Sequence, residues 1–176
     1  MFAISLIVAI ILGYLLKGRL SHLINLQIRG IWLILIGFLL ERGLNLLLKI
    51  GWMELGILTY LLDLLMYILI LIFIWRNSRL KPLCAMGIGF VMNAIPIFAN
   101  GGAMPVSPKA MDYMGISTDA SLTGLYSIMR EETHFKILSD IIPIFLGKVG
   151  FIISMGDIVL CIGMIWLVIK GMRTKQ

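Results

Sequence analysis

Long stretches without charged side chains constrain this chain more than any other feature. No charged residue occurs between Leu83 and Pro108, and Asp63 is the only charge in the stretch 55–75. About 20 apolar residues in a helix cross the hydrocarbon core of a membrane. Hydrophobic residues make up 60% of the chain and charged residues 14%. Soluble domains are less apolar and more charged, and disordered chains are less hydrophobic, so both classes are excluded.

Apolar runs predict membrane-spanning helices over residues 2–16, 31–48, 55–75, 83–100 and 149–169. The first run is short, about 22 Å at 1.5 Å per residue, and Lys17 and Arg19 behind it can extend its reach by snorkelling. The run 137–147 is too short to span and contains Pro143, which favours a re-entrant or interfacial helix on the outer side. The expected fold is one all-α membrane domain over 1–176: a bundle of about five transmembrane helices with an outer segment at 101–148.

Charge distribution predicts how this bundle is oriented. Segments 17–30 and 76–82 and the tail after 169 contain Lys and Arg but no Asp or Glu. An excess of Lys and Arg in short loops marks the cytoplasmic side. Five spans with the N-terminus outside and the C-terminus in the cytoplasm put all three segments on that side, whereas six spans separate them. We therefore expect a multi-pass membrane protein, with the lipid bilayer as its surroundings.

A few polar side chains interrupt the predicted helices at similar depths. Glu41, Arg42, Asp63, Asn93 and Asp157 all fall in the middle-to-outer part of the bundle. A charge facing lipid costs at least about 2.5–3.5 kcal/mol, so these groups should face the interior or a wet cavity. One interpretation is structural, with hydrogen bonds joining the helices. The other is a shared ligand-binding cavity in which one cation faces three acids.

The most distinctive motif follows the fourth predicted helix and reads Asn-Gly-Gly-Ala-Met-Pro-Val over 100–106. Paired glycines permit a positive φ and close backbone approach, and exposed amides in such a turn can bind an anion. The alternative is a helix stop followed by an ordered loop. Together with the polar side chains in the spans, the motif gives the predicted ligand-binding residues: Arg42, Asp63, Asn93, Asn100, Gly101, Gly102 and Asp157.

Motifs for known chemistry are weak in this sequence. There is no nucleophile elbow or zinc-protease motif, and only two histidines occur, so no metal site is predicted and the cofactor is unknown. His134, Asp140 and Asp157 are the candidate acid–base residues should the chain be an enzyme. The basic residues form no continuous patch, which argues against a nucleic-acid partner.

Several short motifs resemble an uncharacterised family of small bacterial multi-pass membrane proteins. They are Lys17-Gly-Arg19-Leu-Ser, Leu26-Gln-Ile-Arg29-Gly-Ile-Trp32, the Asn100-Gly101-Gly102-x-Met104-Pro105-Val106 box, Leu138-Ser-Asp140-Ile-Ile-Pro143 and Ser154-x-Gly156-Asp157. The family has no established activity. The resemblance therefore implies a bacterial plasma-membrane protein and draws attention to the box, Asp140 and Asp157, and it implies no substrate.

Three functions are compatible with these patterns. The first is binding or transport of a small molecule through an outer-facing polar cavity, covered by the segment 100–148. The second is a membrane-embedded enzyme acting on a lipid-linked substrate. The third is a structural or regulatory subunit of a membrane complex, in which the polar residues join helices. A small molecule or a lipid is the expected ligand, and the sequence gives no oligomeric state.

Overall fold

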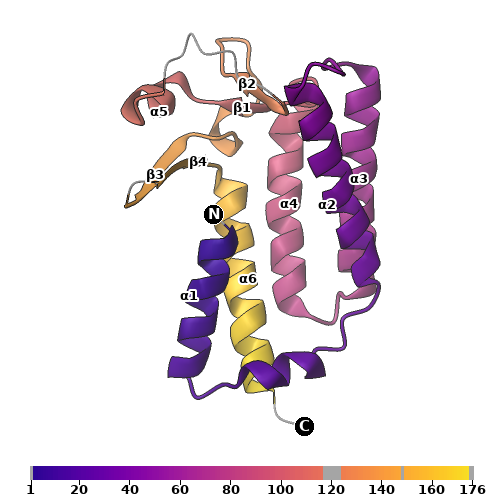
Figure 1. Ribbon diagram of the computed structural model, residues 1–176, viewed down its shortest axis with the longest axis vertical. Helices are drawn as coiled ribbons and strands as arrows, with labels where there is room; N and C mark the ends of the chain where they lie inside the picture. Colours follow the sequence, from indigo (N-terminus) through magenta and orange to yellow (C-terminus); the bar gives the residue numbers. More distant parts are fainter. Residues whose placement is uncertain (1, 117–123, 148, 175–176) are drawn as a thin grey trace.

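The computed structural model describes residues 2–116, 124–147 and 149–174. Five helices run side by side along the long axis of the molecule (Figure 1): α1 (Phe2–Leu15), α2 (Ile31–Lys49), α3 (Ile57–Arg76), α4 (Lys81–Ala99) and α6 (Met155–Arg173). A short 3-10 helix, η1 (Leu20–Asn25), connects α1 to the rest at the lower end of Figure 1. The predicted helical bundle is therefore present.

Four of these helices, α2, α3, α4 and α6, are long and apolar enough to cross a membrane. The first helix, α1, has 14 residues, or about 21 Å, which is less than the roughly 30 Å of a hydrocarbon core. The five spans expected from the sequence thus correspond to four helices of sufficient length and one shorter apolar helix.

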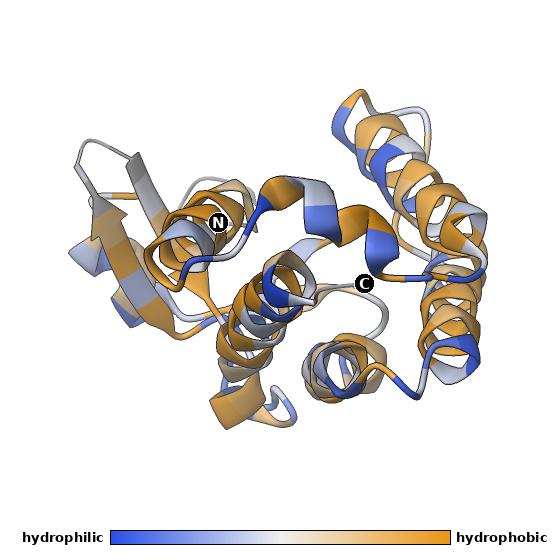
Figure 2. Cartoon of the chain, turned by 90° about the horizontal axis from the view of Figure 1, so that it is seen from below, coloured by the Kyte–Doolittle hydropathy of each residue, from blue (hydrophilic) through white to orange (hydrophobic). Residues whose placement is uncertain are grey.

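The outward faces of the helices are strongly apolar. Leu39 is 72% exposed, Ile57 74% and Trp75 76%. Figure 2 shows hydrophobic residues along the helices and hydrophilic ones on the connecting segments at the lower end. Soluble monomers rarely expose contiguous apolar surface of this kind, whereas lipid solvates it. The pattern is that of a bundle surrounded by a bilayer.

Glycines allow α4 and α6 to pack closely. A Cβ atom on Gly89 would lie 2.7 Å from the carbonyl oxygen of Gly156, and one on Gly163 would lie 2.6 Å from Cγ of Met86. Small residues at such contacts let helix backbones approach in membranes, where van der Waals packing drives association. This pair of helices carries two of the polar residues described below.

The outer segment covers the upper end of the bundle (Figure 1) and contains short strands. Strand β1 (Met104–Val106) pairs in parallel with β2 (Tyr126–Ile128), and β3 (Ile142–Leu146) pairs antiparallel with β4 (Val149–Ile153). The helix α5 (Pro108–Tyr113) and the 3-10 turn η2 (Lys136–Leu138) complete it.

The prediction of a re-entrant or interfacial helix at 137–147 was wrong. Ile142–Leu146 and Val149–Ile153 pair as the antiparallel strands β3 and β4, and Gly147, directly after β3, has φ of +63°. Pro143 disrupts a helix interior, and the Ile- and Val-rich stretches around the turn favour strands. The expected last span, 149–169, correspondingly begins later, at Met155, because 149–153 belong to β4. The all-α expectation is corrected by these strands.

Candidate functional site

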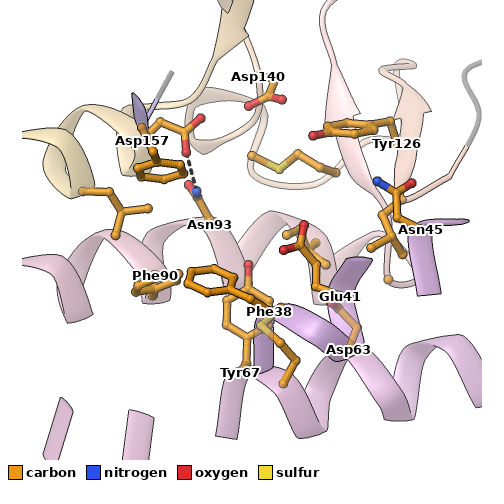
Figure 3. Close-up of a pocket in the computed structure, with 17 residues that line it drawn as sticks. Phe38, Glu41, Asn45, Asp63, Tyr67, Phe90, Asn93, Tyr126, Asp140 and Asp157 are labelled. Atoms are coloured by element: carbon orange, nitrogen blue, oxygen red, sulfur yellow. Dashed lines mark hydrogen bonds between the residues drawn. The ribbon is translucent and has the colours of Figure 1, made fainter. Parts of the chain in front are cut away.

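A cavity of about 180 Å³ lies between the upper parts of the helices and the outer segment (Figure 3). Its walls come from α1, α2, α3, α4 and α6, from the β1–β2 pair, and from Asp140, which lies just before β3. The lining residues are Phe2, Phe38, Glu41, Asn45, Asp63, Met66, Tyr67, Phe90, Asn93, Ile97, Gly102, Met104, Leu125, Tyr126, Asp140, Asp157 and Leu160. The lining residues therefore come from segments that are far apart in the sequence.

Four carboxylates line this cavity, each from a different part of the chain. Glu41 comes from α2, Asp63 from α3 and Asp157 from the first turn of α6, while Asp140 precedes β3. Figure 3 shows Glu41, Asp140 and Asp157 around the same central space. Among the described lining residues there is no Lys, Arg or His. The cavity is thus acidic and lacks a cation of its own within the part of the chain that is described.

Asp157 is held by a hydrogen-bonded network that also starts α6. Asn93 Nδ2 donates to Asp157 Oδ1 at 3.0 Å, and the Ser154 backbone N–H donates to Asp157 Oδ2 at 3.2 Å. Ser154 Oγ donates to Asn93 Oδ1 at 2.7 Å and accepts from the Asp157 N–H at 3.0 Å. This is a capping box, and the helix dipole favours a carboxylate in the first turn. Asp157 therefore has a structural role as well as a place in the cavity wall.

Asp140 differs because its side chain is not paired in this way. Only 6% of the residue is exposed, and its Oδ1 atom is buried without a hydrogen-bond partner among the described residues. The backbone is fixed by the box: the Asp140 N–H donates to the Pro105 carbonyl at 3.0 Å, and the Asp140 carbonyl accepts from the Ser107 N–H at 2.9 Å. Burial, with a smaller contribution from the charge of Asp157, raises the pKa of Asp140 to about 8.

The box folds the outer segment onto the bundle. Asn100 Nδ2 donates to the carbonyls of Pro96 at 2.7 Å and His134 at 3.0 Å, and the His134 N–H donates to Asn100 Oδ1 at 2.9 Å. Gly101 and Gly102 adopt φ of +80° and +88°, which glycine tolerates best. Gly102 lines the cavity, whereas Asn100 and Gly101 are not among its lining residues.

Arg42 and His134 lie outside the cavity lining, contrary to the sequence-based expectation for Arg42. Both side chains are exposed. Arg42 follows Glu41 directly, so the helix turns it about 100° away from the cavity. Its long side chain can reach the outer surface by snorkelling. The cavity therefore lacks the cation that the sequence predicted for it.

Of the predicted ligand-binding residues, the structure brings Asp63, Asn93, Gly102 and Asp157 together. Their role in binding stays a prediction. Glu41 and Asn45 also line the cavity, and their i, i+4 spacing on α2 was the signal available for them. Tyr126 gave no signal, because only the parallel pairing of β2 with β1 places it there.

Comparison with known proteins shows a family without an assigned function. The model of DUF5317, a family of unknown function, matches residues 24–169. The chain belongs to this family. The matched range includes all four carboxylates of the cavity. The resemblance found in the sequence is thereby confirmed at the level of an uncharacterised family, and the box as its signature stays a prediction.

A relative from Thermotoga maritima, itself an uncharacterized protein, is 30% identical over 172 residues. The match covers 96% of this chain and 89% of the relative. No solved structure matches the chain.

Proposed function

We propose that this chain is a multi-pass plasma-membrane protein that binds a small molecule from the outer side and transports it through the acidic cavity. The observation that carries the proposal is the convergence of Glu41, Asp63, Asp140 and Asp157 on one cavity. Ionisable groups within membrane helices are costly and face the interior or a water-filled cavity, where they mark ligand or ion pathways. Helix packing alone does not require four acids around one space.

The charge pattern supports an outward orientation. In Figure 1 the basic segments that follow α1, α3 and α6 lie at the lower end, and the outer segment lies at the upper end. The positive-inside rule assigns such a basic end to the cytoplasm. The cavity and the outer segment then face the cell exterior, and α1 is the fifth, short crossing.

The enzyme alternative has less support from the geometry. Of its three candidate acid–base residues, Asp140 and Asp157 line the cavity, whereas His134 is exposed and absent from the cavity lining. The structural-subunit alternative predicts that the cavity residues serve only to join helices. Asp157 fits that interpretation through its capping box. Asp140 does not, because its buried Oδ1 atom has no hydrogen-bond partner among the described residues.

The test is a thermal-stability screen of the purified full-length chain in detergent against small metabolites, with native mass spectrometry for molecules that co-purify. We expect at least one compound to raise the unfolding temperature of the wild type. Glu41→Gln should abolish that shift, and Glu54→Gln, at an exposed site, should keep it. A shift that survives Glu41→Gln, or a screen without any stabilising compound, would contradict the proposal.

A further inference from the structure

The charge of the cavity lining restricts the chemistry of its ligand. Its four carboxylates face a space that the described lining provides with no basic side chain. In a region of low dielectric, uncompensated negative charge favours either protonation or a bound cation. An anionic ligand would add to the repulsion, so the electrostatics favour a cation.

The buried oxygen of Asp140 provides an independent sign of a missing partner. Oδ1 of Asp140 has no hydrogen-bond partner among the described residues, although the residue is 94% buried and lines the cavity. A buried acceptor without a donor is costly. Backbone hydrogen bonds to Pro105 and Ser107 hold the main chain of Asp140 at the cavity wall. A donor carried by a ligand would satisfy it.

Aromatic rings complete the lining. Each ring comes from a different element, α1, α2, α3, α4 or β2, and the residues are Phe2, Phe38, Tyr67, Phe90 and Tyr126. Figure 3 shows Phe38, Phe90 and Tyr67 below the carboxylates of Glu41 and Asp157. The faces of aromatic rings attract ammonium groups, and cages of such rings recognise quaternary ammonium ligands. Carboxylates and aromatic rings together are the lining that an organic cation requires.

A bare metal ion fits this site less well. Among the described residues, no group of three or more His, Cys, Asp or Glu side chains lies close enough to hold a metal ion. The carboxylates surround the cavity instead of converging on one point, and its volume is roughly ten times what one water molecule needs. The space suits a molecule of several non-hydrogen atoms.

We propose that the ligand of this cavity is a small organic ammonium ion that lies between the acidic side chains of Glu41, Asp63 and Asp140, with its carbon atoms against the aromatic rings. This inference rests on the proposed function and specifies its substrate class. Both carboxylate oxygens of Asp157 already accept hydrogen bonds, from Asn93 and Ser154. Asp157 therefore contributes negative charge to the cavity wall and is not proposed to accept a hydrogen bond from the ligand.

The experiment compares ligands of equal shape and different charge on the full-length chain in detergent at constant ionic strength. The probes are choline, its neutral carbon analogue 3,3-dimethylbutan-1-ol, n-butylammonium, n-butyrate and Mg²⁺, with binding measured by calorimetry. We expect at least one ammonium probe to bind at least tenfold more tightly than its neutral or anionic counterpart. Asp63→Asn should weaken that binding at least tenfold, and Asp112→Asn, at an exposed site, should leave it unchanged.

A second variant covers the case in which Asp63→Asn does not fold. Phe90→Leu keeps an apolar side chain but removes a ring, and it should weaken choline binding several-fold more than binding of the neutral analogue. Equal or tighter binding of the neutral or anionic probe, or binding of Mg²⁺ alone, would overturn the ammonium assignment and leave the proposed function standing. If neither these probes nor any compound in the metabolite screen binds, the proposed function itself fails.

Discussion

The side chain of Asp140 lies in surroundings that disfavour its charge. Its pKa is raised to about 8 in the folded chain, against 3.8 for an ordinary aspartate. Between these values the folded chain holds a proton that the unfolded chain has lost, so the free energy of unfolding falls as pH rises through this window. The side chain in Asp140→Asn cannot titrate. Between pH 5 and pH 8 the free energy of unfolding of the wild type should therefore fall by at least about 1 kcal/mol more than that of the variant.

The measurement is the thermal unfolding midpoint in one detergent at several pH values. Other titratable groups near the cavity, present in both proteins, are Glu41, Asp63, Tyr67, Tyr126 and Asp157. The difference between wild type and variant therefore isolates Asp140. Asp112→Asn serves as the matched control and should follow the wild type. Parallel pH profiles for wild type and Asp140→Asn would show that Asp140 ionises normally.

Polar residues that stand alone in an apolar run were predictable as cavity-lining residues. Asp63, Asn93 and Asp157 each interrupt a long uncharged helix, and the cost of burying them implied a shared location. Arg42 was misplaced because depth alone does not give the direction of a side chain, and one step along a helix changes it by about 100°. Tyr126 reaches the cavity through strand pairing that no local pattern specifies.

At the scale of elements, the contact between α4 and α6 fixes the geometry of the site, because Asn93 and Asp157 meet across it. Gly89→Ala would place a Cβ atom 2.7 Å from the Gly156 carbonyl and force the helices apart. We expect a loss of about 1–3 kcal/mol, typical of overpacking, measured as a lower unfolding temperature. Gly43→Ala is the matched control, since nothing lies within 4 Å of its added Cβ and the change should be neutral or slightly stabilising. Equal effects of both variants would exclude close packing as the cause.

Helices were predictable as elements because each needs only a local apolar run, and their observed bounds lie near the predicted ones for α2, α3 and α4. The hairpin was not predicted, because an apolar stretch of 11 residues suits a short helix or a strand equally by hydrophobicity. Pro143 and the positive φ of Gly147 disfavour a helix here, and the structure has strands. Because Ile142 pairs with Ile153, the last helix begins only after this strand.

At the scale of the whole molecule, charge divides the chain into two ends. The basic segments that follow α1, α3 and α6 share one end, and the acidic cavity and outer segment lie toward the other (Figure 1). In the orientation that we propose, this asymmetry places the basic end in the cytoplasm and the acidic cavity on the outer side. A cationic ligand would therefore be attracted on the outer side and would meet a basic surface at the cytoplasmic end.

The orientation itself is the last prediction, and it is tested with single cysteines in a chain from which Cys84 and Cys161 have been removed. Cysteines at Ser21 and Ser78 should be shielded from an impermeant thiol reagent in intact cells, and a cysteine at Glu131 should be labelled. All three native side chains are exposed, and all three cysteines should react after lysis. An epitope fused to the N-terminus tests whether α1 crosses the bilayer. If an antibody reaches the epitope in intact cells while the cysteine at Ser21 is shielded, the two ends of α1 lie on opposite sides of the membrane. A shielded epitope would reduce the bundle to four crossings, and labelling of the Ser21 and Ser78 positions but not of the Glu131 position would invert the whole arrangement.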